Sequence, residues 1–295
     1  MNDLTYAATS VLDIAVESSG PPDGPPVLLL HGWPDDVRTW DGIRPTLARA
    51  GWRTIAPYLR GCGPTRFRSH WTMRSGQLAA IGLDVIELAD ALRLRTFAVV
   101  GHDWGARAAY IAAALVPQRV THCIALSVGW GTNDPSQALS LEQARNYWYQ
   151  WFLTLGRGEQ VLRSEGKRFA RFLWQTWGPA GWIADEDFEA TARSFDNPDW
   201  PEVTLHSYRH RWGLVPGDPA YAELEAKLKT APAITVPTLL LHGDADACND
   251  PETSAGRETL FTGTYQRLLI EGIGHFPTRE APEAVAGAIL AFLYG

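Results

Sequence analysis

The most informative stretch of the sequence reads Phe97-Ala98-Val99-Val100-Gly101-His102-Asp103-Trp104-Gly105. Apolar residues of strand character run into a turn with two glycines, and a helix-compatible segment, 104–116, follows and ends before Pro117. A turn this sharp strains the backbone of its central residue, and a side chain at either glycine would collide. We therefore predict a strand, a tight turn and a helix, with the carboxylate of Asp103 exposed where the helix begins.

Asp103 is a candidate nucleophile at this position. The helix dipole and the free N–H groups of the first turn stabilise a carboxylate there in its ionised, nucleophilic form. Gly-x-Asp-x-Gly after an apolar strand has the form of a nucleophile elbow, with aspartate where serine is usual. The alternative from these residues alone is an ordinary aspartate that caps a helix at a strand-to-helix junction.

Three further motifs favour the catalytic interpretation. Residues 28–35 form a strand that ends in a glycine turn, where a backbone N–H can face a developing oxyanion. Residues 239–246 place carboxylates just past another strand, and residues 272–277 place His275 in a glycine-flanked loop. The order nucleophile, acid, histidine is the one that α/β-hydrolases require. We predict a triad of Asp103, His275 and one carboxylate among Asp244, Asp246 and Asp250, with the N–H groups of Trp33 and Trp104 as oxyanion donors.

The remaining histidines are interpreted as structural. His31, His102 and His242 lie inside the motifs, and His206 and His210 have the i, i+4 spacing of a metal-binding pair. No third ligand accompanies that pair in the sequence, so we predict no metal site.

Short apolar runs alternate with helix-compatible stretches along the chain, which predicts α/β architecture with a sheet buried on both faces. Between them lies a region with little strand signal, where eight of the thirteen tryptophans fall. We predict an α/β core of residues 1–129 and 231–295, with a mostly parallel central sheet and helices on both faces, and an inserted helical lid of residues 130–230. Predicted strands are 27–30, 54–56, 97–100, 123–128, 238–241 and 266–270, and further helices are 74–92 and 281–293.

Composition limits the partners. The net charge of −7 repels nucleic acid and anionic membrane surfaces, and the longest uncharged apolar stretch, 108–116, is too short to span a bilayer. Three cysteines without a Cys-x-x-Cys pair suit a reducing compartment, and the N-terminus lacks the pattern of a secretion signal. We expect a cytoplasmic protein, monomer or homodimer, that acts on a small apolar substrate without nucleic acid or membrane partners.

The motifs resemble the epoxide hydrolase and dehalogenase branch of the α/β-hydrolase superfamily, and soluble epoxide hydrolases most closely. His-Gly-x-Pro at 31–34, Gly-His-Asp-Trp-Gly at 101–105 and Gly-His-Phe at 274–276 carry the resemblance, which covers nearly the whole chain. It implies the α/β-hydrolase fold and Asp246 as the acid, at the last position of Gly-x-x-Asp, with Asp134 as a distant alternative. Chemically, a carboxylate that displaces at a saturated carbon leaves an ester that water can hydrolyse, so no cofactor is needed.

The lid of this branch supplies tyrosines that protonate the epoxide oxygen. Tyr208 resembles the second such tyrosine best, and Tyr149 is preferred to Tyr147 for the first, although each could be an ordinary packed aromatic. We expect an apolar or aromatic substrate. The residues predicted to line its site are Trp33, Trp104, Trp148, Trp151 and Tyr147.

The predicted function is the opening of such an epoxide to a vicinal diol through an ester on Asp103. Haloalkane or haloacid dehalogenation by the same nucleophile is the alternative. Haloalkane dehalogenases usually carry asparagine where Trp33 stands, and fluoroacetate dehalogenases, which the chain resembles at Arg107, carry a substrate-binding arginine where Trp104 stands. An alternative of a different class is a non-catalytic protein that encloses a ligand.

Overall fold

A nine-stranded sheet forms the centre of the computed structural model, which describes residues 3–132 and 138–295. The strand order is β1-β2-β4-β3-β6-β7-β8-β9, with β5 paired to β2. The strands are β1 (Asp3–Ala8), β2 (Leu12–Ser19), β3 (Pro26–Leu30), β4 (Arg53–Pro57), β5 (Arg66–Phe67), β6 (Phe97–His102), β7 (Val120–Leu126), β8 (Thr238–Gly243) and β9 (Tyr265–Ile270).

The sheet is parallel from β4 to β9, and β2 pairs antiparallel with β1, β4 and β5. All six predicted strands overlap observed ones. The core helices are α1 (Arg44–Arg49), α2 (Leu78–Ala91), α3 (Trp104–Leu115), α10 (Pro277–Glu280) and α11 (Pro282–Tyr294), together with the 3-10 helices η1 (Val37–Trp40), η4 (Pro251–Ser254) and η5 (Glu258–Leu260). The predicted α/β-hydrolase architecture is confirmed.

Successive side chains of each central strand point to opposite faces of the sheet and pack in two different apolar layers. In β3, Leu28 and Leu30 join the layer that contains α2 and α3, whereas Val27 and Leu29 join the layer that contains α1 and α11. Because both faces are covered, the central strands are apolar throughout, as a parallel sheet requires. The carboxyl ends of β3, β6, β7 and β8 therefore follow one another in that order, and the loops after them share one edge of the sheet.

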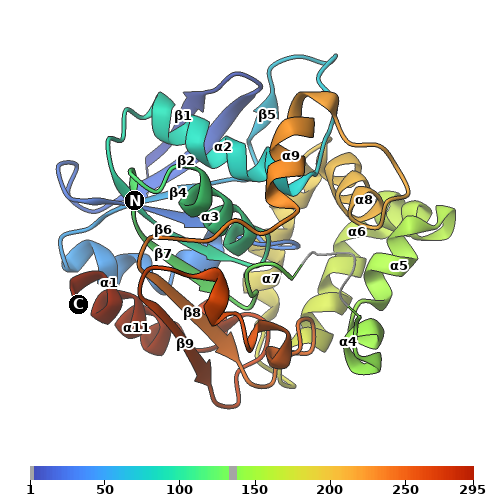
Figure 1. Cartoon of the computed structure of the whole chain (residues 1–295). Coiled ribbons are helices and arrows are strands. Elements are labelled where there is room, and N and C mark those ends of the chain that lie inside the picture. Colours follow the sequence, from blue (N-terminus) through green and yellow to red (C-terminus); the bar gives the residue numbers. More distant parts are fainter. Residues whose placement is uncertain (1–2, 133–137) are drawn as a thin grey trace.

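The helical segment between β7 and β8 lies to one side of the sheet, where Figure 1 shows α5, α6 and α8 packed together. Its helices are α4 (Leu141–Asn146), α5 (Trp148–Thr154), α6 (Gly156–Trp177), α7 (Asp185–Ala192), α8 (Trp200–Arg211) and α9 (Ala222–Leu228), with η2 (Arg193–Asp196) and η3 (Pro219–Tyr221). Leu224 and Leu228 of α9 pack near Ala79 and Ala80 of α2, so this end of the segment is attached to the core. The division into a 130–230 lid and a two-part core stays a prediction.

Two further properties concern the whole described chain. All three cysteines are buried and unpaired. Among residues 3–132 and 138–295, no helix is both long and apolar enough to cross a membrane.

Candidate active site

The turn between β6 and α3 holds Asp103 in a left-handed conformation, with φ 51° and ψ −111°. A Cβ on Gly101 would lie 2.1 Å from the carbonyl oxygen of Gly105, and one on Gly105 would lie 2.2 Å from that of Leu30. Only glycine fits at these two positions, as the sequence pattern predicts. The strained backbone of Asp103 costs about 1–3 kcal/mol, which the packing of strand and helix around it must offset.

The two oxygens of the Asp103 carboxylate have different surroundings. Oδ1 accepts a hydrogen bond from the backbone N–H of Trp33 at 2.9 Å. Oδ2 lies 3.8 Å from Nε2 of His275. Trp104 opens α3, so its N–H is one of the first-turn donors that have no acceptor within the helix. The arrangement can hold one oxygen at a pair of donors and leave the other to face a substrate.

His275 is oriented by Asp246. Nδ1 of His275 donates to Oδ2 of Asp246 at 2.8 Å, while Oδ1 of Asp246 accepts the N–H groups of Cys248 and Asn249, each at 2.8 Å. Burial alone would raise the pKa of Asp246, but the ion pair with His275 and the hydrogen bond to His242 hold that pKa well below its usual range. Burial alone would lower the pKa of His275, and the Asp246 carboxylate outweighs burial and raises it well above its ordinary value.

The other candidate carboxylates for the acid of the triad make contacts away from His275. Asp244 accepts the N–H of Gly272, and Asp250 caps η4. Asp134 lies outside the described residues. The structure therefore brings Asp246, and neither Asp244 nor Asp250, to His275.

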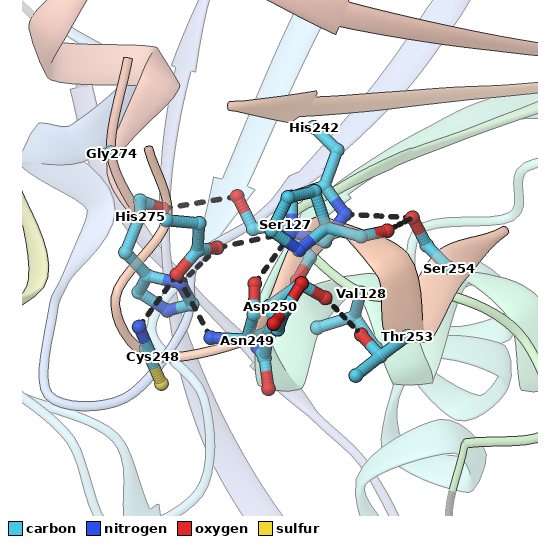
Figure 2. A network of polar contacts seen from close by, with 12 residues as sticks. Ser127, Val128, His242, Cys248, Asn249, Asp250, Thr253, Ser254, Gly274 and His275 are labelled. Carbon is cyan, nitrogen blue, oxygen red and sulfur yellow. Dashed lines mark hydrogen bonds and ion pairs between the residues drawn. The ribbon is translucent and has the colours of Figure 1, made fainter. Parts of the chain in front are cut away.

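A polar network holds the histidine loop in place, as Figure 2 shows. Asn249 donates through Nδ2 to the carbonyl of Ser127, and the Ser127 hydroxyl donates to the carbonyl of His275, both at 3.0 Å. His242 lies with Nε2 3.2 Å from Oδ2 of Asp246 and with Nδ1 2.9 Å from the hydroxyl of Ser254. His242 thus supports the acid directly, a closer involvement than its predicted structural role suggested.

The remaining histidines have structural contacts. His102 lies with Nε2 2.6 Å from the His275 carbonyl, and burial, followed by the charge of His275, lowers the pKa of His102 to about 4. Nε2 of His31 accepts the N–H of Leu59. His206 accepts the N–H of Gly76 and stacks on His210, and in the described part of the chain no group of three His, Cys, Asp or Glu side chains is arranged to hold a metal.

Two tyrosines of the helical segment between β7 and β8 contact the rings of Trp33 and Trp104 near Asp103. Tyr149 and Tyr208 are buried, with ring centroids 5.4 Å apart, and they lie 5.9 and 5.2 Å from the ring of Trp33. Burial raises the pKa of both hydroxyls well above its usual range, and the nearby Asp103 charge adds to this effect. Both hydroxyls therefore keep their protons at neutral pH. Tyr147 is also buried, but its hydroxyl donates to Oδ1 of Asn249 at 3.0 Å.

Trp148 contacts this cluster through the ring of Tyr149, at 6.5 Å between centroids, and that Trp148 and Trp151 line the substrate site stays a prediction. Trp148 is 37% exposed and packs on Phe169 and Phe172 of α6, and Trp151 is 36% exposed and packs on Trp212. Successive residues on a helix point about 100° apart. The rotation of α5 about its axis therefore points Tyr149 toward Trp33, and it leaves Trp148 and Trp151 partly exposed on another side of the helix.

Other lid residues near the site were not predicted from the sequence. The carbonyl of Trp177 accepts the N–H of His275 at 2.9 Å, and its ring lies 5.1 Å from the imidazole and 4.9 Å from Tyr149. Trp200 stacks on Trp33, whose indole N–H donates to the Thr204 hydroxyl at 2.9 Å. Tryptophan enrichment marked the lid, but no local pattern separates Trp177 and Trp200 from the others.

Comparison with known proteins agrees with this geometry. The sequence matches the family described as alpha/beta hydrolase fold over residues 25–282. It is also 33% identical to Epoxide hydrolase B of Mycobacterium tuberculosis (strain ATCC 25618 / H37Rv), over 94% of each chain. The chain is an α/β-hydrolase of the epoxide hydrolase branch.

Two further relatives of this α/β-hydrolase cover nearly its full length. Epoxide hydrolase A of the same Mycobacterium tuberculosis strain is 27% identical, over 97% of this chain and 96% of the relative. The crystal structure of a proposed epoxide hydrolase from Klebsiella pneumoniae subsp. pneumoniae MGH 78578 superimposes with a TM-score of 0.92 at 38% identity, over 98% of this chain and 97% of that one. These matches confirm the predicted family and the prediction that the chain is a hydrolase.

Proposed function

We propose that this α/β-hydrolase opens a small apolar or aromatic epoxide to a vicinal diol through an alkyl-enzyme ester on Asp103. The observation that carries the proposal is a carboxylate in the elbow with two buried, protonated tyrosines near enough for its charge to raise the pKa of both. A carboxylate can attack a saturated carbon, and the departing epoxide oxygen needs an acid. The relatives named Epoxide hydrolase A and Epoxide hydrolase B support the same substrate class.

In the first half-reaction, Oδ2 of Asp103 attacks an epoxide carbon and the carbon–oxygen bond of the ring breaks. The alkoxide takes the proton of the Tyr149 or Tyr208 hydroxyl, which leaves a hydroxyalkyl ester and a tyrosinate. In the second, His275 takes a proton from water as the water oxygen attacks the ester carbonyl.

The tetrahedral oxyanion then lies at Oδ1, where the Trp33 N–H already donates and the Trp104 N–H is available. Collapse of this intermediate releases the diol, whose leaving oxygen takes its proton from His275. The regenerated carboxyl group of Asp103 returns a proton to the tyrosinate, and the cycle closes without a cofactor.

The direct test offers the enzyme an aryl epoxide and the halide of the same carbon skeleton, and measures diol and free halide. We expect diol from the epoxide and no halide. Halide release without diol would instead establish dehalogenation. Neither product, together with ligand binding that survives Asp103→Ala, would establish a non-catalytic ligand-binding protein.

One observation bears on the dehalogenase alternative. The indole N–H of Trp104 is buried and has no hydrogen-bond partner among the described residues, so it could donate to a halide. The indole N–H of Trp33 already donates to Thr204. Because a leaving halide needs several converging donors, this arrangement favours epoxide hydrolysis.

Removing the hydroxyl of either lid tyrosine should slow ring opening. We expect Tyr149→Phe and Tyr208→Phe each to lower kcat/KM for the epoxide roughly 100-fold, the typical contribution of a positioned general acid. Tyr147→Phe is the matched control, because its hydroxyl is bound to Asn249. Steady-state kinetics on the three variants check this. If a Tyr149 or Tyr208 variant turns over the epoxide as fast as the control, that tyrosine does not donate the proton.

The rate of ester hydrolysis should rise with pH. His275 acts as a base only when neutral, and Asp246 raises the pKa of this imidazole well above 6.5. Below that pKa the imidazole is charged and hydrolysis is slow; above it the rate reaches a plateau. Asp246→Asn should move the midpoint to lower pH, measured by single-turnover kinetics at each pH. Asp244→Asn is the control, and an unmoved midpoint in Asp246→Asn would contradict the assignment.

A further inference from the structure

The hydroxyl of Tyr149 receives a hydrogen bond from the residue that follows it in α5. Nε2 of Gln150 donates to the Tyr149 hydroxyl oxygen at 3.0 Å, and Gln150 is only 1% exposed. Oε1 of the same amide accepts the indole N–H of Trp212 at 3.1 Å. An indole N–H can only donate, so the amide oxygen has to face Trp212 and the amide nitrogen has to face Tyr149. The contact with Trp212 therefore fixes Gln150 as a donor to Tyr149.

The proton of the Tyr149 hydroxyl is not committed to a strong acceptor. Among the described residues, the acceptors near this hydroxyl are Sγ of Cys248, at 3.7 Å, and the hydroxyl of Tyr208. A thiol sulfur accepts hydrogen bonds weakly, and a neutral phenol oxygen is a far weaker acceptor than an alkoxide. The proton is therefore available to the oxygen of an opening epoxide.

A tyrosinate at this position needs a hydrogen-bond donor, because little water reaches it. Tyr149 is 3% exposed, and burial raises the pKa of its hydroxyl well above the usual range. A hydrogen bond to a charged acceptor is stronger than one to a neutral acceptor. The Gln150 N–H therefore stabilises the tyrosinate more than it stabilises the phenol, and its contribution grows as the proton leaves.

The hydroxyl of Tyr208 has different surroundings. Within residues 3–132 and 138–295, no N–H group donates to it. The guanidinium of Arg211 lies over the ring of Tyr208, 5.1 Å from the centroid. Burial and then the Asp103 charge raise the pKa of Tyr208, and Arg211 opposes this only in part. The Tyr208 hydroxyl can bind the epoxide oxygen, whereas the Gln150 bond favours Tyr149 as the group that gives up its proton.

We propose that Gln150 is a positioning residue for ring opening: its amide N–H holds the Tyr149 hydroxyl and stabilises the tyrosinate formed when Tyr149 protonates the epoxide oxygen. Oδ2 of Asp103 forms its bond to carbon as the carbon–oxygen bond of the ring breaks, and the Tyr149 proton moves to the leaving oxygen. The negative charge of the carboxylate thus passes to the tyrosine oxygen, which accepts the Gln150 N–H. This inference rests on the proposed function.

The first test separates formation of the ester from its hydrolysis, with styrene oxide in single-turnover experiments followed by intact-mass spectrometry. We expect Gln150→Met to slow ester formation about tenfold, because the lost hydrogen bond strengthens when its acceptor becomes charged. Ester hydrolysis should keep its rate, since His275 activates the water in that step. Equal slowing of both steps would indicate a structural role and overturn the proposal.

Gln77→Met is the matched control for this experiment. Gln77 is another buried glutamine, at the start of α2, and its Oε1 accepts the hydroxyl of Ser75. Its replacement makes the same chemical change away from Tyr149. Both rates should stay at the wild-type values in this variant.

A double-mutant cycle tests whether Gln150 acts through Tyr149. In a Tyr149→Phe background, Gln150→Met should cause no further loss in the rate of ester formation, because the acceptor is gone. In a Tyr208→Phe background it should cause the full loss of about tenfold. A full loss in both backgrounds would mean that Gln150 acts by packing, and a loss that vanishes only with Tyr208→Phe would make Tyr208 the acid. Either result overturns the proposal.

The basicity of the leaving oxygen gives a readout that packing alone does not change. The alkoxide formed from trifluoromethyloxirane is less basic than the one formed from methyloxirane, so its departure needs less help from an acid. We expect Gln150→Met to slow the opening of methyloxirane by the larger factor. An equal loss for the two epoxides would contradict a role in stabilising the tyrosinate.

Trp212→Phe is the second variant, in case Gln150→Met does not fold. It removes the N–H that fixes the amide, and Trp212 is only partly buried. We expect a smaller loss, again in ester formation alone. If the wild type forms the ester on Asp103 and both variants form it as fast, the role of Gln150 is overturned and epoxide hydrolysis stands. If the wild type forms no ester from any epoxide, the proposed function itself fails, and the role of Gln150 with it.

Discussion

Asp103→Asn is expected to lower kcat for the epoxide by roughly 10⁴-fold or more, the scale on which enzymes lose rate when a nucleophile is removed. The amide has the shape of the carboxylate but is a far weaker nucleophile. Asparagine has nearly the same size and shape as aspartate, so the elbow should keep its geometry.

Diol formation measured by chromatography checks the Asp103→Asn prediction. Quenching of tryptophan fluorescence by bound epoxide provides the control, since Trp33 and Trp104 stack at 6.1 Å between ring centroids beside the site. We expect binding to persist while turnover is lost. Turnover within tenfold of the wild type would mean that Asp103 is not the nucleophile.

His275→Gln is expected to stop the reaction at the ester, because in the proposed mechanism His275 is the base that activates the attacking water. Ring opening needs only Asp103 and the tyrosines, so the adduct should accumulate while hydrolysis slows about 10³-fold or more. Intact-mass spectrometry should find the protein heavier by one whole epoxide, and peptide mapping should place the adduct on Asp103.

A haloalkane serves as the comparison in the His275→Gln experiment, since its adduct would fall short of the added molecule by one hydrogen halide. His210→Gln is the matched control, because His210 lies on α8 outside the triad and should leave no lasting adduct. Full turnover by His275→Gln without any adduct would contradict the proposed role of His275.

The elbow could be predicted from the sequence because its physics is local. An apolar strand, two glycines and a following helix lie within a few residues of Asp103, and the close contacts at Gly101 and Gly105 show why the pattern is strict. The positions of Asp246 and His275 followed from similar short motifs after strands. Parallel pairing of those strands then brings the motifs to one edge of the sheet.

Which side chains of the helical segment between β7 and β8 face the site could not be predicted in the same way. Trp148 and Tyr149 are neighbours in the sequence, but the rotation of α5 brings only Tyr149 to the ring of Trp33. Trp177 reaches His275 because α6 ends beside the histidine loop. The stacking of Trp200 on Trp33 likewise depends on how α8 packs against the core, and no spacing in the sequence encodes it.

The proposed ester on Asp103 is tested most directly by one turnover in H₂¹⁸O, with enzyme in excess over epoxide. If water attacks the ester carbonyl, the first diol takes its new oxygen from Asp103, and the solvent oxygen stays in the carboxylate. The proposed mechanism therefore predicts an unlabelled diol in the first turnover and a peptide containing Asp103 that is 2 Da heavier. A diol that carries ¹⁸O in the first turnover, with Asp103 unlabelled, would show that water opens the ring directly.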